Sequence, residues 1–509
     1  MSEKIAIIGA GIAGLSTGCY ARMNGFDAEI FEAESVPGGL CTAWKRGDYW
    51  IDGCIHWLTG SGPGNEFYDF WNEIGALEGK RIVDHEAFVR LTNREGGELV
   101  VYSDADRLEE HLKALSSEDK EPIEQLCGWI RHAGRINMPM DKAAELMGPV
   151  DLAKMGLSMV PHMGIFREMG SLTCGSFAER FRSPLLKATF PHIFGAGFGI
   201  IGLVMTLVTF NQRSAGYPIG GSRAFAETIE KRFLELGGSI RYRARVAKVL
   251  VERDRAVGIR LEDGSEVRAD WVVSASDLRA AVDKLLERRY VEPQHEELYA
   301  KVPISPTMVQ VAFGVSKNLS GEPDCVYQVV ELPEPMTIGG QPVDWATMKN
   351  YAYDPTLAPA GKTVVMLMLP ADYDYWKSLA ADRRNYDAEK ERVARASADI
   401  LERRYPGFKA AIEETDVATP ISFERYTSNY RGSFMTWMMP FEMRSKGMVI
   451  KKTLPGLERF YLAGMWVMAP GGLPSAVKTG RDVVQIICSK SGRRFRSKVA
   501  EPGVAAKAG

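Results

Sequence analysis

Three glycines near the start of the chain have a spacing that could hold a phosphate group. Gly9, Gly11 and Gly14 form the pattern Gly-x-Gly-x-x-Gly. In this pattern the first glycine permits a tight turn, the second lets a pyrophosphate approach the backbone, and the third lets a helix pack closely on a strand. The residues of the predicted phosphate loop are Gly9, Ala10, Gly11, Ile12, Ala13 and Gly14. The pattern therefore predicts a dinucleotide site.

An acidic residue follows this loop at the distance that such a site requires. Glu32 lies about 20 residues after Gly11, where a carboxylate bonds the ribose hydroxyls of a dinucleotide. We expect Glu32 and the adjacent Ala33 to contact the bound nucleotide. Because a carboxylate repels a 2′-phosphate, this position disfavours NADP.

The elements that must position these residues occupy the same stretch. Residues 4–8 are a short apolar run that predicts a buried parallel strand. Residues 12–23 predict a helix that ends before Gly25, and residues 28–31 predict a second strand. A secretion signal would also have a basic start and an apolar run, but Glu3 interrupts that pattern and no disulfide-rich domain follows. The strand, helix and strand favour the dinucleotide site.

A second pair of glycines lies just after the predicted acidic contact. Gly38 and Gly39, followed by Leu40, resemble the second glycine turn of FAD-dependent oxidoreductases, where the backbone passes close to the cofactor. The alternative is a simple surface turn after Pro37. The glycine turns predict FAD rather than NAD, provided that a matching segment exists elsewhere in the chain.

The C-terminal part of the chain contains such a segment. A predicted strand at 459–463 ends at Gly464, and a predicted helix at 475–487 follows Pro474, which is a typical helix start. The N–H groups at the start of this helix could face the N1–C2=O edge of a flavin, where the helix dipole stabilises negative charge. The expected contacts in this segment are Gly464, Met465, Leu473 and Ser475.

Together these segments resemble the phytoene desaturase, carotenoid isomerase and retinol saturase family of flavoproteins. The resemblance covers most of the chain and includes "GYPIGGSRAFAETI", "YDPTLAPAGKTVV", "ERRYPGF", "TPISFERYTSNYRGSF" and "GGLPSAVKTGR". "DGCIHWL" most resembles the retinol saturase branch. The resemblance implies FAD as the cofactor and an α/β fold, in which a Rossmann-type, glutathione-reductase-like FAD domain is interleaved with a mixed α+β substrate domain.

The resemblance also implies roles for single residues. Val246 would offer its backbone to the adenine, and His56 would lie near the flavin as the candidate catalytic residue. The alternative for His56 is a core histidine bonded to the backbone. Two positions depart from the family: Leu40 stands where desaturases often have Arg, and Met465 stands where many relatives have Asp. The predicted lining residues of the substrate site are Trp57, Tyr217, Arg425, Tyr430 and Trp437.

The order of the segments predicts an interleaved chain. We expect strands at 240–246, 248–252 and 256–261, with a hairpin turn at Asp263-Gly264, inside the middle part of the FAD domain. The predicted divisions are FAD-binding parts at 1–81, 210–301 and 451–490, a helical insertion at 82–209, a substrate domain at 302–450 and a basic, disordered tail at 491–509.

Two apolar stretches predict contact with lipid or with an apolar substrate. Residues 193–210 carry no charge, which just reaches the length of a transmembrane candidate, but a buried helix or a helix lining an apolar tunnel also explains them. Residues 147–170 are similarly apolar, and the basic stretch 490–498 could touch anionic headgroups. A second Gly-x-Gly-x-x-Gly at 197–202 lacks the flanking strands and acid, so we interpret it as close packing rather than a nucleotide site.

The composition excludes several classes of protein. The 509 residues carry a net charge of −2, which argues against a nucleic-acid partner. The seven cysteines show no CxxC spacing, so no metal site or disulfide framework is expected, and a reducing compartment fits best. We expect a cytoplasmic protein that is peripheral to the inner face of a membrane.

The leading hypothesis is an FAD-dependent desaturase or saturase that acts on carbon–carbon bonds of a long apolar isoprenoid or polyene. Three alternatives stay open: a redox-neutral polyene cis-trans isomerase, an amine-oxidase-like flavoenzyme, and a flavin-binding lipid carrier without catalysis. The sequence contains no second dinucleotide motif of the right form. Electrons must therefore pass to or from the substrate, a partner protein, or NAD(P)H bound without such a motif, and the sequence does not identify the acceptor.

Overall fold

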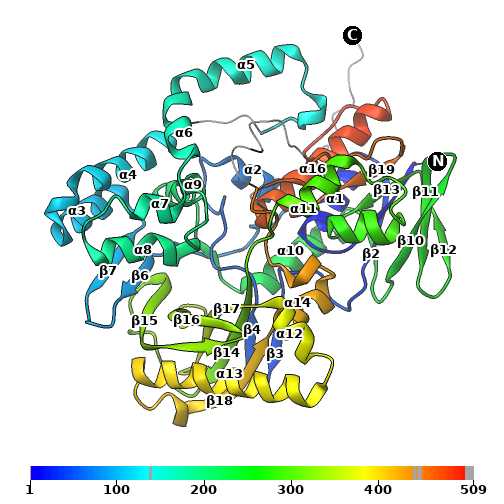
Figure 1. The fold of residues 1–509 in the computed structure, drawn as a ribbon. Coiled ribbons are helices and arrows are strands. Elements are labelled where there is room, and N and C mark those ends of the chain that lie inside the picture. Colours follow the sequence, from blue (N-terminus) through cyan, green and yellow to red (C-terminus); the bar gives the residue numbers. More distant parts are fainter. Residues whose placement is uncertain (1, 137–139, 440–442, 444–449, 470, 499–509) are drawn as a thin grey trace.

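The computed structural model describes residues 2–136, 140–439, 443, 450–469 and 471–498 (Figure 1). Its centre is a parallel sheet with the strand order β19-β13-β1-β2-β9. The strands are β1 (Lys4–Ile8), β2 (Asp27–Phe31), β9 (Ser239–Arg241), β13 (Trp271–Ser274) and β19 (Phe460–Leu462). Parts from the beginning, middle and end of the chain thus share one sheet, which is the Rossmann-like arrangement predicted from the sequence.

Three long helices pack beside this sheet. They are α1 (Ile12–Met23), α10 (Gly221–Glu235) and α16 (Gly472–Lys490). Small residues allow close packing: a Cβ on Gly18 would lie 2.7 Å from the Phe233 ring, and one on Gly480 would lie 2.8 Å from the Ala13 carbonyl oxygen. The C-terminal helix therefore lies directly on the first helix of the chain.

An antiparallel sheet of three strands extends from the parallel sheet. It consists of β10 (Val246–Glu252), β11 (Arg255–Leu261) and β12 (Glu266–Arg268), and Gly264 has the positive φ of 85° expected in the hairpin turn. One prediction here is wrong. Residues 240–246 do not form a single strand, because β9 ends at Arg241 and the chain turns through Arg243, whose φ is 54°, before β10 begins.

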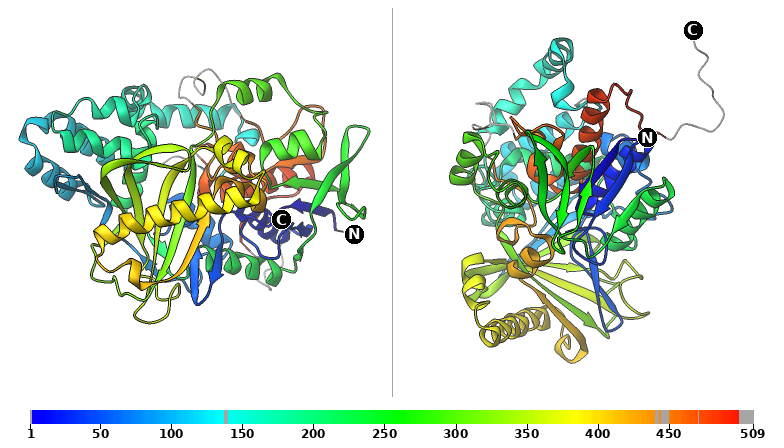
Figure 2. Two further views of the ribbon diagram at one scale, coloured as in Figure 1. Left: turned by 60° about the horizontal axis from the view of Figure 1, so that its bottom comes forward. Right: turned by 90° about the vertical axis from the view of Figure 1, so that its right-hand side faces the viewer.

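A second, mixed sheet has the strand order β18-β14-β17-β16-β15-β6-β7. Its strands are β6 (Ala87–Thr92), β7 (Glu98–Tyr102), β14 (Thr307–Val315), β15 (Cys325–Ile338), β16 (Gln341–Asn350), β17 (Thr363–Ala371) and β18 (Ile412–Ala418). The helices beside it include α12 (Tyr373–Leu379), α13 (Arg383–Arg404) and α14 (Pro420–Thr427). Figure 2 shows α13 lying along the outer side of this sheet.

The sequence predicted a helical insertion at 82–209, but the structure shows that this segment is only partly helical. It begins with β5 (Ile82–Val83) and with β6 and β7, and β6 pairs with β15 of the second sheet. The pairing is favoured because β6 is apolar on both faces, and Phe88, Val89 and Leu91 are fully buried. The sheet of the substrate domain therefore contains strands that precede the middle FAD segment in the chain and strands that follow it.

The rest of this segment forms a helical part, visible at the upper left of Figure 1. Its helices are α3 (Ala105–Leu115), α4 (Lys120–Ala133), α5 (Pro149–Met159), α6 (Met163–Gly170), α7 (Cys174–Ala178), α8 (Pro184–Phe194) and α9 (Ile200–Asn211). Residues 193–210 are divided by the turn between α8 and α9. Among the described residues, no helix combines the length and the apolar character needed to cross a membrane.

Residues 491–498 differ from the disordered tail that the sequence analysis expected. Arg493 donates hydrogen bonds to the carbonyl oxygens of Asn24 and Gly25 at the end of α1, at 3.1 and 3.0 Å, and forms an ion pair with Glu3 at 3.1 Å. Its guanidinium also lies over the Phe26 ring. A cation at a helix C-terminus is favourable, which explains why this basic stretch docks instead of extending into solvent. Residues 499–509 lie outside the described residues.

Candidate functional site

The two predicted glycine turns at the N-terminal end touch each other. The Gly38 N–H donates to the Ala10 carbonyl oxygen at 2.9 Å, and Gly11 and Gly38 form an isolated parallel bridge. Gly39 has a φ of 60°, and a Cβ at this position would lie 3.3 Å from the Gly11 Cα. The turn after Pro37 is therefore packed against the phosphate loop.

The phosphate loop has the geometry that its glycines predicted. Gly9 adopts a φ of 98°, and a Cβ on Gly14 would lie 1.9 Å from the Gly9 carbonyl oxygen. Helix α1 starts at Ile12, and no side chain caps its start at Gly11. The first N–H groups of an α-helix have no partner within the helix, so this end can bind an anionic group.

Glu32 lies at the end of β2 beside this loop, and 8% of the residue is exposed. Its Oε2 accepts the Ala10 N–H at 2.6 Å, and its Oε1 accepts the Glu34 N–H at 2.8 Å. The Ala244 N–H donates to the Glu32 carbonyl oxygen at 2.8 Å, which brings the start of β10 and the buried Val246 close to Ala33. The residues predicted for the nucleotide half of the site thus come together.

The C-terminal glycine turn meets the same loop. Gly464 has a φ of 124°, and a Cβ there would lie 3.8 Å from the Ala13 Cβ. The Gly464 N–H donates to the Thr479 hydroxyl of α16 at 2.8 Å. Near the start of α16, the Ser475 hydroxyl donates to the Gly471 carbonyl oxygen at 2.9 Å. Distant segments of the chain therefore converge on one place, as the sequence analysis required.

The phosphate loop, Glu32 and the turns at Gly38 and Gly464, which together we call the cradle, fit an extended dinucleotide such as FAD. A Cβ on Gly11 would meet no atom closer than the Gly38 carbonyl oxygen at 3.8 Å, whereas a Cβ on Gly14 would overlap the Gly9 carbonyl oxygen. The open side of the loop is the side on which a pyrophosphate approaches in a Rossmann fold. Leu40 and Met465 directly follow the turns at Gly39 and Gly464, Leu473 lies in the first turn of α16, and all three are partly buried.

Comparison with known proteins decides the family. The model of the family described as "Flavin containing amine oxidoreductase" matches residues 12–488. The chain belongs to this family. It is an FAD-dependent oxidoreductase, and the resemblance found in its motifs is confirmed by similarity to carotenoid desaturases and isomerases.

Among its relatives, phytoene desaturase (neurosporene-forming) of Rhodobacter capsulatus is 25% identical, over 95% of this chain and 94% of that protein. Prolycopene isomerase of Daucus carota is 26% identical over 46% of this chain, and the match spans only 38% of that relative's length. Cyclohexylamine oxidase from Brevibacterium oxydans has a similar fold, with a TM-score of 0.62, 14% identity, and coverage of 97% of this chain and 100% of that one.

A buried polar cluster lies around His56 and Lys349. Lys349 on β16 is 0% exposed, and its Nζ donates to the His56 carbonyl oxygen at 2.8 Å. Burial lowers the pKa of Lys349 to about 7, although the nearby Asp52 charge opposes this shift. Burial and then the Lys349 charge hold the pKa of His56 well below its usual value, so the imidazole is neutral.

Asp52 holds the segment that carries His56. Its carboxylate accepts the Tyr217 hydroxyl at 3.1 Å, the Ser222 N–H at 2.9 Å, the Ser222 hydroxyl, and the Cys54 N–H at 3.1 Å. Burial raises the pKa of Asp52, while the bonds from Ser222 and Cys54 oppose that shift. These bonds tie the turn before His56 to the start of α10.

Four of the five predicted lining residues fall into two groups, and Arg425 belongs to neither. Trp57 and Tyr217 lie in or beside the cluster around Lys349. Tyr430 and Trp437 pack instead in a separate apolar cluster near Asp277, whose pKa is raised to about 6 by burial. Arg425 is exposed and lies near its neighbour Tyr426. The structure therefore gathers only Trp57 and Tyr217 around His56.

The residues predicted for the site did not include Lys349, Asp52 or two tyrosines near Lys349, Tyr327 and Tyr353, whose ring centroids lie 5.7 and 5.8 Å from its Nζ. A signal for Lys349 existed, because a lone lysine stands between Met348 and Asn350 in a run that alternates like a half-buried strand. A charge at such a position is either on the solvent face or functional, and the pattern alone does not say which face is buried.

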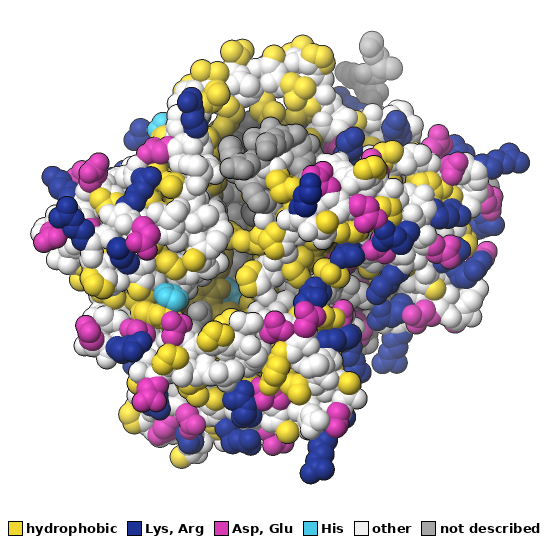
Figure 3. Space-filling view, viewed as in Figure 1, with side chains coloured by type: hydrophobic (Ala, Val, Ile, Leu, Met, Phe, Trp, Pro, Cys, Tyr) yellow, Lys and Arg dark blue, Asp and Glu magenta, His cyan; other side chains and the backbone are white. Residues whose placement is uncertain are grey.

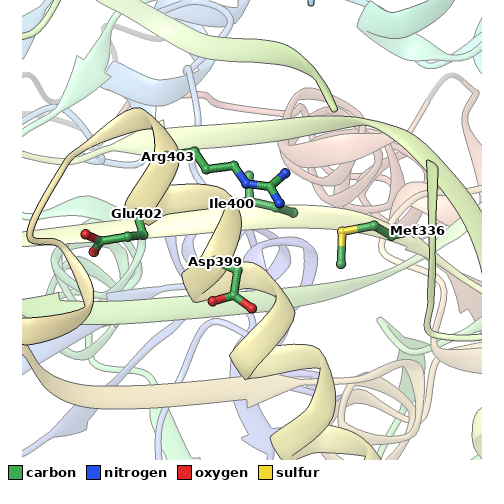
Figure 4. A pocket seen from close by; sticks show the side chains of 5 residues that line it. All are labelled: Met336, Asp399, Ile400, Glu402 and Arg403. Atoms are coloured by element: carbon green, nitrogen blue, oxygen red, sulfur yellow. The ribbon is translucent and has the colours of Figure 1, made fainter. Parts of the chain in front are cut away.

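Figure 4 shows a pocket on another part of the second sheet, between β15 and α13. Met336, Asp399, Ile400, Glu402 and Arg403 line it. Asp399 already pairs with Lys409 at 2.7 Å, and Glu402 accepts the backbone N–H groups of Gly407 and Lys409. Because these carboxylates are satisfied by the protein itself, we assign no ligand to this pocket.

The lowered pKa of Lys349 predicts a pH-dependent stability. In the unfolded chain this lysine titrates near its ordinary pKa of about 10.4, so between about pH 7 and 10 the unfolded state binds more protons than the native state. Above the unfolded pKa the lysine is neutral in both states and costs no stability. As the pH falls towards about 7, the unfolded state gains a proton that the native state does not hold, and the free energy of unfolding decreases. We expect the free energy of unfolding of wild type minus that of Lys349→Met to rise between pH 7 and 9, by up to about 1.4 kcal/mol per pH unit.

Urea denaturation at several pH values measures this difference. The matched control is Lys231→Met, which removes a lysine on α10 whose side chain is 75% exposed. A Lys349→Met difference that stays constant from pH 7 to 9 would contradict the expected titration.

Proposed function

We propose that this protein is a desaturase or saturase that transfers hydride between FAD and a carbon–carbon bond of a long, apolar isoprenoid or polyene. Its relatives of similar length include phytoene desaturases, and phytoene desaturase (lycopene-forming) of Pseudescherichia vulneris is 21% identical over 95% of this chain and 99% of that protein. The chain spans only 38–39% of the prolycopene isomerases of Daucus carota and Arabidopsis thaliana, so their activity alone does not support the proposal.

The observation that carries the proposal is an aromatic wall that starts at His56. Its members are Trp57, Tyr327, Phe194 and Phe198, all of which are partly exposed. The Trp57 ring lies 6.1 Å from Tyr327 and 6.2 Å from Phe194, and Phe194 lies 4.9 Å from Phe198. Figure 3 shows that the face is hollowed between the helical part and the second sheet, with hydrophobic side chains around the hollow. Such a wall binds a long apolar chain by burial, at ~25 cal/mol per Å².

The cradle residues would hold the cofactor in this proposal. The phosphate loop and the start of α16 would bind the pyrophosphate and stabilise charge at the flavin, and Glu32 would bind the ribose. The residues proposed to contact FAD are Gly9, Ala10, Gly11, Ile12, Ala13, Gly14, Glu32, Ala33, Gly38, Gly39, Leu40, His56, Val246, Gly464, Met465, Leu473 and Ser475.

When bound, FAD supplies hydride transfer, and the protein supplies placement. The aromatic wall orients the apolar chain and excludes water from the reacting bond. The neutral His56 imidazole has a free ring nitrogen, because its buried Nδ1 has no hydrogen-bond partner among the described residues. His56 can therefore accept the proton that leaves the substrate as hydride is removed.

A redox-neutral isomerase is the second candidate, because several relatives are prolycopene isomerases. An amine oxidase is less favoured although solved neighbours include amine oxidases. In this chain the rings of Tyr217 and Tyr351 lie 5.4 and 5.1 Å from the Lys349 amino group, which therefore occupies the space where a substrate amine would contact them. The protonated form of Lys349 would also repel a protonated amine.

We also propose a peripheral contact with a membrane surface. Helices α5 and α6 and the turn between them expose large apolar side chains at the top of Figure 3. Val150, Leu152, Leu157, Val160 and Met163 are 52–73% exposed. An apolar surface of this kind suits the boundary of a bilayer, from which an apolar substrate could enter. Sedimentation with and without lipid vesicles tests it, and Leu157→Glu should weaken any binding.

The test of the main proposal is anaerobic mixing of the FAD-loaded protein with a polyene. Loss of the visible flavin band together with a product that has two fewer hydrogens supports desaturation. Starting from reduced flavin, reoxidation with a product that has two more hydrogens supports saturation. Isomerised product without net change in the flavin supports the second candidate. No change in flavin or polyene, together with flavin reduction by an amine, would overturn the proposal.

A further inference from the structure

The buried cluster around Lys349 has the form of a cage that still has a free donor. The Nζ lies 5.1 to 5.8 Å from the ring centroids of Tyr217, Tyr327, Tyr351 and Tyr353, which together with Lys349 we call the lysine cage. Among the described residues, the His56 carbonyl oxygen is the one hydrogen-bond acceptor that this nitrogen has. A lysine carries two N–H groups when neutral and three when charged, so at least one remains to donate.

Besides His56 Nδ1, which the proposed function uses as the proton acceptor, two buried polar atoms around the cage have no hydrogen-bond partner among the described residues. They are His85 Nε2 and the Tyr353 hydroxyl. The His85 ring lies 4.6 Å from the Tyr353 ring, so both atoms belong to the same neighbourhood. A buried polar atom without a partner costs about 1–3 kcal/mol, and native proteins rarely keep several together. These atoms therefore point to a polar ligand group.

The cage and the aromatic wall share Tyr327. Lys349 itself is fully buried, but His56, Tyr327 and Tyr353 are partly exposed, and Tyr327 contacts Trp57 of the wall. A molecule lying along the wall can thus bring one end to the cage. Since the wall is apolar and the cage polar, the site suits a chain with different chemistry at its two ends.

We propose that the lysine cage binds the oxygen of a hydroxyl or carbonyl end group on an otherwise apolar substrate. This inference rests on the proposed function and names its substrate class. A carboxylate is less suitable, because the Asp52 carboxylate already lies close enough to influence Lys349 and would repel a second negative charge. An anchored oxygen fixes how far the chain extends along the wall, and so selects which carbon–carbon bond reacts.

Equilibrium binding to the FAD-loaded protein tests the cage. The probes are geranylgeraniol, geranylgeranial and the matching C20 hydrocarbon without oxygen. We expect wild type to bind the alcohol or the aldehyde about tenfold more tightly than the hydrocarbon, as one or two buried hydrogen bonds provide. Lys349→Met and Tyr353→Phe should reduce this preference to about twofold or less while the affinity for the hydrocarbon stays the same.

Tyr299→Phe is the matched control, because its hydroxyl is also buried without a partner among the described residues but lies beside Trp437, away from the cage. It should keep the full preference. If Lys349→Met does not fold, Tyr353→Phe carries the test, since it removes only a hydroxyl. Equal affinity of wild type for all three probes would overturn the inference and indicate that the cage holds only water. Such a result leaves the proposed function standing if a hydrocarbon polyene still reduces the flavin. A clear preference for the alcohol or the aldehyde without any flavin reduction would count against the proposed function alone.

Discussion

The variant Gly11→Val is expected to be a folded protein without flavin. Gly11 has a φ of −66° and a ψ of 173°, which valine can also adopt, and a Cβ there would lie no closer than 3.8 Å to the protein. The added methyl groups would instead occupy the open side of the phosphate loop, where the pyrophosphate must approach the backbone. We expect FAD affinity to fall at least about a hundredfold, which corresponds to about 2.7 kcal/mol. The flavin absorbance that remains after purification and dialysis measures this loss.

The second glycine motif provides the matched control. Gly199 is the middle glycine of that motif and precedes α9 with a φ of −64°, and a Cβ there would meet nothing within 4 Å. Gly199→Val therefore makes the same change before another helix. It should retain full flavin content, because no strand or acid completes a nucleotide site there. Loss of flavin in Gly199→Val, or full occupancy in Gly11→Val, would refute the assignment of the cradle.

The cradle could be predicted from the sequence because its physics is local. The turn at Gly9, the helix start after Gly11 and the acid at Glu32 depend on neighbours within one strand–helix–strand unit, and both elements β1 and α1 have the predicted bounds. The C-terminal turn at Gly464 was found the same way. Its meeting with Ala13 was an inference from the resemblance, which the packing of α16 on α1 now explains.

The substrate side could not be predicted in the same way. Lys349 and His56 are far apart in the chain, and their contact depends on how β16 pairs within a seven-stranded mixed sheet. Which face of a strand is buried follows from that pairing, and a shift by one residue would turn Lys349 to the opposite face. The same limit explains the error at 82–209, where the partner of β6 is a strand more than 200 residues away.

The local motifs and the long-range contacts give information about different parts of the function, the cofactor and the substrate. The local motifs identify the cofactor, which any member of the family can share. The long-range contacts place a neutral histidine, a lysine with a lowered pKa and an aromatic wall beside one another. The choice of substrate and reaction depends on these contacts, so the experiments on Lys349 and Tyr353 test the end group of the substrate, and anaerobic mixing with a polyene distinguishes the candidate reactions.

The variant Gly480→Val is expected to disrupt both the fold and the cofactor site. A Cβ on Gly480 would lie 2.8 Å from the Ala13 carbonyl oxygen and 3.0 Å from both the Ser16 Cβ and the Thr17 nitrogen. Backbone atoms of α1 cannot yield to a valine, so α16 must move away from α1. We expect the free energy of unfolding to fall by about 3 kcal/mol, as overpacking in a core does, with loss of flavin because the turn at Gly464 moves with the helix.

Urea denaturation should be compared among the flavin-free forms of Gly480→Val, Gly11→Val and wild type, because bound flavin stabilises the folded state by mass action. The control is Gly128→Val inside α4, where a Cβ would meet nothing within 4 Å and valine is a better helix former than glycine. It should retain the stability and flavin content of wild type. If Gly480→Val also retained both, α16 would not lie on α1 in solution, and the N- and C-terminal glycine turns would not form one site.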